Sequence, residues 1–120
     1  MNGFSRLVAI GGAAALFAAG PAFAHAELVR SSPAANATVQ APRTITLTFS
    51  ERVVPAFSKF ELAMPAHNMK IPVKTTVSPD GKRIVGTVPS ALMKGAYTIT
   101  WTAAGADGHR MTGKVAFKVG

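Results

Sequence analysis

The feature that most constrains this chain is a strict alternation of apolar and polar residues. Between Thr44 and Phe49, the apolar side chains Ile45, Leu47 and Phe49 alternate with threonines. A period of two with many β-branched residues predicts a half-buried strand. Related runs recur along the chain, at Phe60–Met64, Ile71–Val77, Tyr97–Trp101 and Val115–Val119, with shorter candidates at Leu28–Val29 and Ile84–Val88.

Turn residues separate these runs, as in Ser78-Pro79-Asp80-Gly81 and Ala106-Asp107-Gly108. After the first two dozen residues, no window keeps a helical period, and about seven short strands favour an all-β sandwich or Greek-key barrel. We expect residues 33–42 to form a loop between the first two strands. We expect Trp101, the largest side chain in the chain, to fill the core.

The amino-terminal stretch has the pattern of a cleaved secretory signal peptide. Arg6 precedes an uncharged apolar run, Gly20-Pro21 breaks it, and Ala22-Phe23-Ala24 matches an A-x-A cleavage site. The run is too short for a membrane-spanning helix, which needs about 20 apolar residues. The sequence therefore predicts a signal peptide at residues 1–24, one β domain at residues 25–120, and export to the periplasm.

Charge and cysteine content narrow the function classes. The net charge is +8, but the basic residues are scattered and the leader predicts export, so we expect no nucleic-acid partner. The chain has no cysteine. Thiolate metal sites and cysteine catalysis are therefore excluded, and an apolar core must supply the stability that disulfides often give exported domains.

Cleavage after Ala24 would make His25 the first residue of the mature chain. Its α-amino group and imidazole are then two nitrogen donors that can chelate one metal ion, and such donors in a tetragonal arrangement suit Cu(II). Asp107-Gly108-His109 can present a carboxylate and an imidazole from one tight turn, because glycine supplies the backbone freedom. The alternative interpretation of that tripeptide is a simple hairpin turn.

Four separated motifs resemble the CopC family of periplasmic copper-resistance proteins, and together they cover essentially the whole predicted mature chain. They are His25-Ala26-Glu27-Leu28-Val29 with the Ser-x-Pro-Ala-x-Asn that follows, Ile45-Thr46-Leu47-Thr48-Phe49-Ser50-Glu51, Gly95-x-Tyr97-x-Ile99-x-Trp101, and Asp107-Gly108-His109-x-Met111-x-Gly113 with Val115-x-Phe117-x-Val119.

The resemblance implies an immunoglobulin-like Greek-key fold and a copper-binding role in resistance, sequestration or delivery. It implies Cu(II) ligands at His25, Asp107 and His109, with Glu51 as a nearby or weakly bound oxygen. It also implies copper partners, such as an inner-membrane copper transporter of the CopD type or another copper chaperone.

Some members of the family hold Cu(I) in a methionine-rich loop, and Met64, His67 and Met69 occupy the corresponding region here. Thioether sulfur is a soft donor that suits Cu(I). This loop has fewer methionines than the richer clusters. Met64 can alternatively point inward at the end of its strand, and His67 can simply be a solvated loop residue.

Two other functions compete with non-enzymatic copper binding. A copper-dependent oxidase can also use a terminal histidine brace, but few large aromatics are available for a substrate platform, and the Asp107 carboxylate occupies a position that oxygen chemistry needs open. A metal-free partner-binding β domain makes no use of His25, Asp107 or His109. We therefore expect a copper-binding protein rather than an enzyme.

Overall fold

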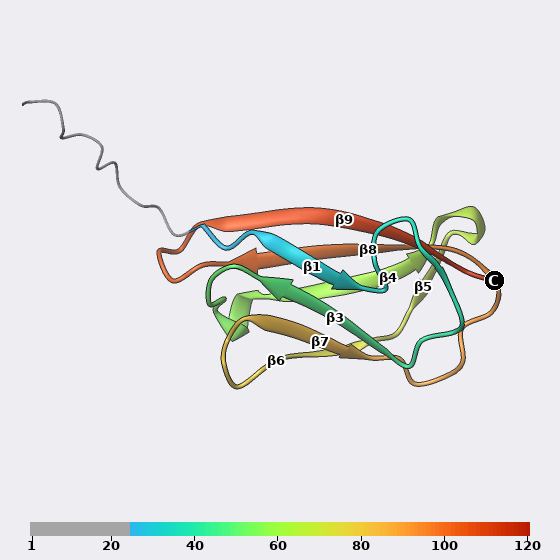
Figure 1. The fold of residues 1–120 in the computed structure, drawn as a ribbon, viewed down its shortest axis with the longest axis horizontal. Coiled ribbons are helices and arrows are strands. Elements are labelled where there is room, and N and C mark those ends of the chain that lie inside the picture. Colours follow the sequence, from blue (N-terminus) through green and yellow to red (C-terminus); the bar gives the residue numbers. More distant parts are fainter. Residues whose placement is uncertain (1–24) are drawn as a thin grey trace, which may run out of the picture.

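A computed structural model describes residues 25–120, so the predicted signal peptide lies outside the described residues. The described chain forms two packed β-sheets, with strand order β1-β3-β7-β6 in one and β2-β9-β8-β4-β5 in the other (Figure 1). Two short 3₁₀ turns, η2 (Pro55–Phe57) and η3 (Pro65–His67), are the only helical elements between residues 25 and 120. The strands are β1 (Leu28–Ser32), β2 (Thr38–Val39), β3 (Thr44–Phe49), β4 (Lys59–Met64), β5 (Met69–Ile71), β6 (Lys74–Val77), β7 (Arg83–Thr87), β8 (Gly95–Ala104) and β9 (Arg110–Val119).

The predicted all-β, Greek-key sandwich class is confirmed, because the described chain crosses between the two sheets at β1–β2, β2–β3, β3–β4, β5–β6 and β7–β8. One strand prediction is wrong in detail. The run from Ile71 to Val77 is two strands, of which β5 pairs with β4 and β6 pairs with β7 in the other sheet. Pro72 lies at the break, and proline has no N–H to donate to a ladder. The alternating pattern continues across the break, and the sequence pattern therefore predicts a single strand.

The predicted loop at residues 33–42 also contains a strand. Thr38 and Val39 of β2 pair in parallel with Lys118 and Val119 of β9. Two residues are too few to show a periodic pattern, and a parallel pairing joins segments distant in sequence. The pairing adds β2 to the edge of the five-stranded sheet. Together with the division of the 71–77 run, it gives nine strands among the described residues rather than about seven.

The alternating apolar residues meet between the sheets and form one core. Ile45, Leu47 and Phe49 of β3 are at most 1% exposed. The prediction that Trp101 fills the core is confirmed, since its side chain is buried and packs edge-on against Phe49, with ring centroids 5.1 Å apart. Gly113 lies directly opposite Trp101 on β9, and a Cβ there would lie 2.6 Å from the indole ring. Glycine at that position therefore makes room for the indole.

The long β8–β9 hairpin runs from one end of the sandwich to the other. Its turn lies at the end where the described chain begins, whereas the β4–β5 connection with η3 lies at the opposite end (Figure 1). Candidate metal donors occur at both ends. No helix among the described residues is long and apolar enough to cross a membrane.

Candidate metal centre

The β8–β9 turn holds the Asp-Gly-His tripeptide. The ladder ends at the pair Ala104 and Arg110, and the turn is closed by Gly105 N–H donating to the His109 carbonyl at 3.0 Å. Gly108 has φ +88°, a left-handed conformation that favours glycine. Its N–H donates to the Gly105 carbonyl at 2.9 Å. The tripeptide is therefore a hairpin turn, and this turn brings the two side chains that flank Gly108 together.

Within the turn, the Asp107 carboxylate contacts His109 twice. Its Oδ1 accepts a hydrogen bond from the His109 backbone N–H at 3.0 Å, and its Oδ2 lies 2.8 Å from His109 Nδ1. These contacts favour the ionised carboxylate and lower the pKa of Asp107 from its usual 3.8. The side-chain contact with His109 is the largest cause, and the charge of His25 is a smaller one. Asp107 is thus a carboxylate at neutral pH and can act as an oxygen ligand.

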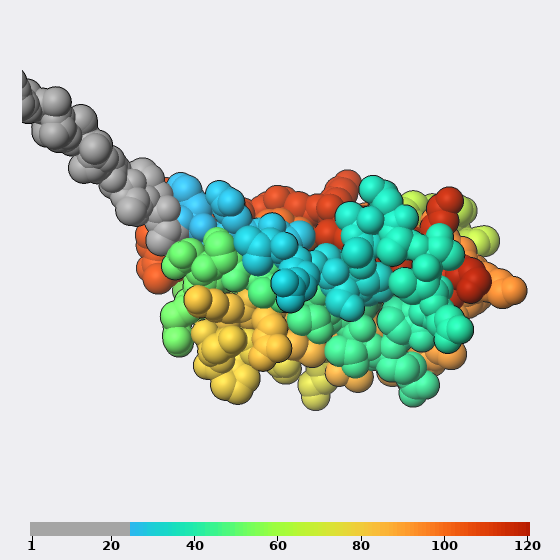
Figure 2. Space-filling view, in the orientation of Figure 1, coloured from blue at the N-terminus to red at the C-terminus, as the bar shows by residue number. Residues whose placement is uncertain are grey.

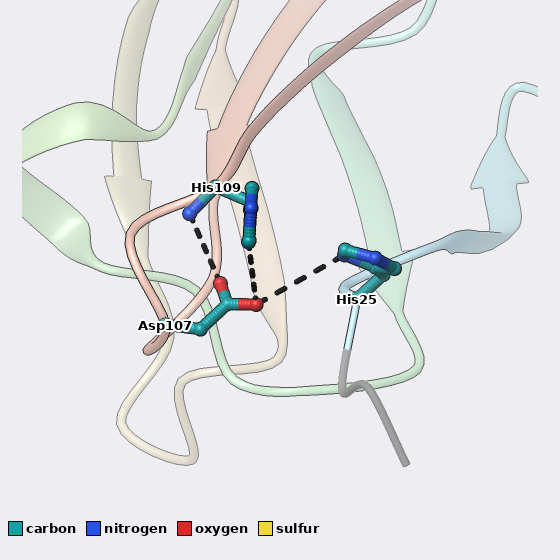
Figure 3. A group of neighbouring side chains, drawn as sticks. All are labelled: His25, Asp107 and His109. Atoms are coloured by element: carbon teal, nitrogen blue, oxygen red, sulfur yellow. Dashed lines mark hydrogen bonds and ion pairs between the residues drawn. The ribbon is translucent and has the colours of Figure 1, made fainter. Parts of the chain in front are cut away.

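The third side chain comes from the beginning of the described chain. His25 Nδ1 lies 4.0 Å from Asp107 Oδ2, and its ring meets the His109 ring edge-on with centroids 5.3 Å apart. Figure 3 shows the Asp107 carboxylate between the two imidazoles. A segment at the start of the domain and a turn near its end therefore share one location.

His25, Asp107 and His109 form a group in which one ligand atom from each residue lies within 4.8 Å of the others. Their side chains are 42%, 32% and 65% exposed, respectively, so the cluster is open to an incoming ion. Figure 2 shows the blue amino-terminal segment and the orange hairpin tip on the surface at the same end of the molecule. We call this group the hairpin cluster.

Glu51 is exposed and lies outside the hairpin cluster. The residue before it, Ser50, makes the contacts with the amino-terminal segment. Its Oγ accepts a hydrogen bond from the Glu27 N–H at 3.0 Å and donates to the His25 carbonyl at 3.4 Å. Ala26, between those two residues, is 1% exposed and belongs to the core. Sequence reasoning missed Ser50 and Ala26, because an isolated serine or alanine carries no metal-binding pattern.

The methionine loop, residues 64–69, lies at the other end of the sandwich. Met64 is 1% exposed, as the inward-pointing alternative predicts, and a Cβ at Gly95 would lie 2.7 Å from its methyl carbon. His67 is exposed at the end of η3, and Met69 is 41% exposed. Of the three candidate Cu(I) donors, two are accessible and the third fills the core.

Matches to known proteins identify the family. The sequence profile of the CopC domain matches residues 28–120. The chain belongs to the CopC family. A copper resistance protein C from Xanthomonas campestris pv. juglandis is a CopC relative with 41% identity over 112 residues, which is 88% of each chain.

Two CopC-type crystal structures resemble the fold. PcoC, a methionine-rich copper resistance protein from Escherichia coli, has a TM-score of 0.74 and 36% identity, covering 81% of this chain and all of that one. CopC from Methylosinus trichosporium OB3b has a TM-score of 0.72 and 25% identity, covering 79% and 93% of the two chains. The CopC profile match begins at Leu28, so His25 precedes it, whereas Asp107 and His109 lie within it.

Proposed function

We propose that this protein is a periplasmic copper-binding protein that holds one Cu(II) ion in the hairpin cluster. The observation that carries the proposal is the convergence of His25, Asp107 and His109 on one accessible point. Membership of the CopC family and the copper-resistance names of its relatives support copper as the ion. The expected roles are resistance, sequestration or delivery of copper.

The proposed ligand set requires cleavage after Ala24. His25 then supplies its free amine and its imidazole, His109 supplies a second imidazole, and Asp107 supplies an oxygen. Nitrogen-rich sets of this kind suit tetragonal Cu(II), which also stands at the top of the divalent affinity series, so zinc and nickel should compete poorly. The exposed position of Glu51 outside the cluster supports a site that does not depend on it.

Protons should compete with the metal. The nitrogen ligands must give up their protons to coordinate, and His109 and Asp107, which contact each other through Nδ1 and Oδ2 at 2.8 Å, would both hold the ion. The lowered pKa of Asp107 keeps its carboxylate ionised throughout the working range. We therefore expect Cu(II) affinity to fall steeply toward about pH 5, because protons compete with the ion for its nitrogen ligands.

We propose binding without chemical turnover. Asp107 Oδ2 lies 2.8 Å from one imidazole nitrogen and 4.0 Å from the other, so the carboxylate would take up a coordination position that an oxidase would leave for oxygen. Peroxide production with ascorbate and air should therefore not exceed that of free copper. A rate well above free copper would favour the oxidase alternative.

A Cu(I) site in the methionine loop is a narrower proposal, because it relies on the exposed donors His67 and Met69. Transfer of copper to a CopD-type transporter or to another copper chaperone is likewise proposed.

The test is titration of the mature chain, residues 25–120 with an authentic His25 terminus confirmed by mass spectrometry. We expect a d–d absorption band and one tetragonal EPR signal, both saturating at one equivalent of Cu(II). An absence of both signals at one equivalent would refute the proposed function. Mass spectrometry of the exported protein that shows a different first residue would remove the amine ligand.

A further inference from the structure

The segment His25–Glu27, which we call the arm, lies along the end of β3 and is held there by Ser50. The backbone of Ser50 donates to the Glu27 carbonyl at 2.8 Å, extending the β1–β3 pairing beyond its last strand residues. Its hydroxyl accepts from the Glu27 N–H at 3.0 Å and donates to the His25 carbonyl at 3.4 Å. One side chain thus bridges backbone groups on both sides of Ala26.

Ala26 provides a second, apolar attachment. Its methyl group is buried in the core at the point where the arm leaves β1, with 1% of the residue exposed. Burial of this residue fixes the path of the arm, and the hydroxyl of Ser50 fixes its backbone groups. His25 therefore lies next to the buried Ala26 with its own carbonyl bonded to Ser50, and its ring projects toward Asp107 (Figure 3).

We propose that Ser50 is a positioning residue for copper binding: its bridge to the arm fixes the backbone of His25 so that the ring and the α-amine face Asp107 and His109. The inference rests on the proposed function. The amine and the imidazole branch from the same Cα, so a fixed carbonyl on that residue limits the directions that both nitrogens can take. A site ordered before binding does not lose that conformational entropy when the ion arrives.

The bridge also changes the role of cleavage. In the full-length chain, His25 Nδ1 already lies 4.0 Å from Asp107 Oδ2. The arm contacts involve residues 25–27 and 50, all of which remain after cleavage at Ala24. Cleavage would therefore add an amine ligand to an imidazole that Ser50 already holds in place, rather than allow the site to assemble afterwards.

The test compares three variants of the mature chain. Ser50→Ala removes the hydroxyl, Ser50→Thr keeps it, and Ser31→Ala is the matched control, because the Ser31 hydroxyl bonds the Pro33 carbonyl elsewhere on β1. We expect Ser50→Ala to weaken Cu(II) binding about tenfold and to broaden the EPR hyperfine lines, as loss of one or two hydrogen bonds would predict. Ser50→Thr should restore both properties, and Ser31→Ala should match the wild type.

Wild-type affinity and an unchanged EPR spectrum in Ser50→Ala would overturn the positioning role, as would an equal loss in Ser31→Ala. Either result, obtained with a wild type that binds one Cu(II), leaves the proposed function standing. Failure of the wild type itself to bind would instead overturn both.

A measurement on the unmodified protein covers the case in which Ser50→Ala does not fold. The Glu27 amide should exchange slowly with solvent deuterium in the metal-free mature chain, because it donates to Ser50 Oγ. Exchange at the rate of an unstructured peptide would overturn the inference.

Discussion

The two ends of the sandwich present candidate metal donors in different ways. At the hairpin end, His25 and His109 are far apart in sequence, and strand pairing brings both to the carboxylate of Asp107. In the methionine loop the donors are close in sequence, yet Met64 belongs to the core while Met69 is 41% exposed. Proximity in sequence is therefore a poor guide to a metal site in this β-sandwich. Met64 and Met69 are paired across β4 and β5, yet only Met69, on the edge strand β5, is accessible.

Substitution of one imidazole at each end should give the largest contrast. We expect His109→Ala to abolish stoichiometric Cu(II) binding, because it removes one of the proposed imidazole ligands, a greater loss than the roughly 10–100-fold effect of an outer partner. His67→Ala is the matched control and should leave Cu(II) affinity unchanged. Competition titration with a chelator of known affinity measures both. Equal losses of Cu(II) affinity in the two variants would contradict the proposal that Cu(II) binds at the hairpin cluster rather than at the methionine loop.

The next contrast separates stability from binding within the methionine loop. Met64→Ala should lower the free energy of unfolding by about 2–5 kcal/mol, because it leaves a cavity in the core. Met69→Ala, on the exposed side of the loop, should cost less than about 1 kcal/mol. Urea denaturation of the metal-free variants measures both values. Similar costs for the two substitutions would mean that Met64 does not pack as the structure indicates.

The hairpin end can be tested at its amine. One extra residue before His25 leaves both imidazoles and the carboxylate but converts the amine to an amide. We expect Cu(II) affinity to fall by at least about tenfold, or roughly 1.4 kcal/mol, with a shift in the EPR parameters. The same extension should not change Cu(I) binding by the methionine loop. Undiminished Cu(II) affinity in the extended protein would refute amine coordination.

The smallest expected effect is on acid stability. The hydrogen bonds from His109 lower the pKa of Asp107 below its unfolded value of 3.8. The ionised carboxylate therefore stabilises the fold above about pH 4, and this contribution is lost as the pH falls through the lower folded pKa. Asp107→Asn should flatten the decline in melting temperature of the metal-free protein between about pH 4 and pH 2. Parallel profiles for the two proteins would contradict this electrostatic role.

Much of the fold could be predicted because its causes are local. The alternation at Thr44–Phe49 follows from one buried face, and the burial of Trp101 follows from its size. Two features could not be predicted: the passage of the chain from one sheet to the other at Pro72, and the short strand β2. Both depend on which distant segment becomes the partner, and the alternating pattern does not contain that information.

The candidate site likewise contains residues that could be predicted from the sequence and one that could not. Asp107 and His109 could be proposed from a three-residue motif and His25 from a cleavage pattern, because each signal is contiguous in sequence. Ser50 could not, because its importance arises only when β3 ends beside the arm. The Phe-Ser-Glu stretch drew attention to Glu51, whereas the contact with the arm is made by the serine before it.

The most direct measurement is the position of copper in crystals of the mature chain loaded with one equivalent of Cu(II), located by anomalous scattering at the copper edge. We expect a single strong peak between His25, Asp107 and His109, with the His25 amine among the ligands. A principal peak beside His67 and Met69, or a copper ion that contacts neither His25 nor His109, would contradict the proposed centre.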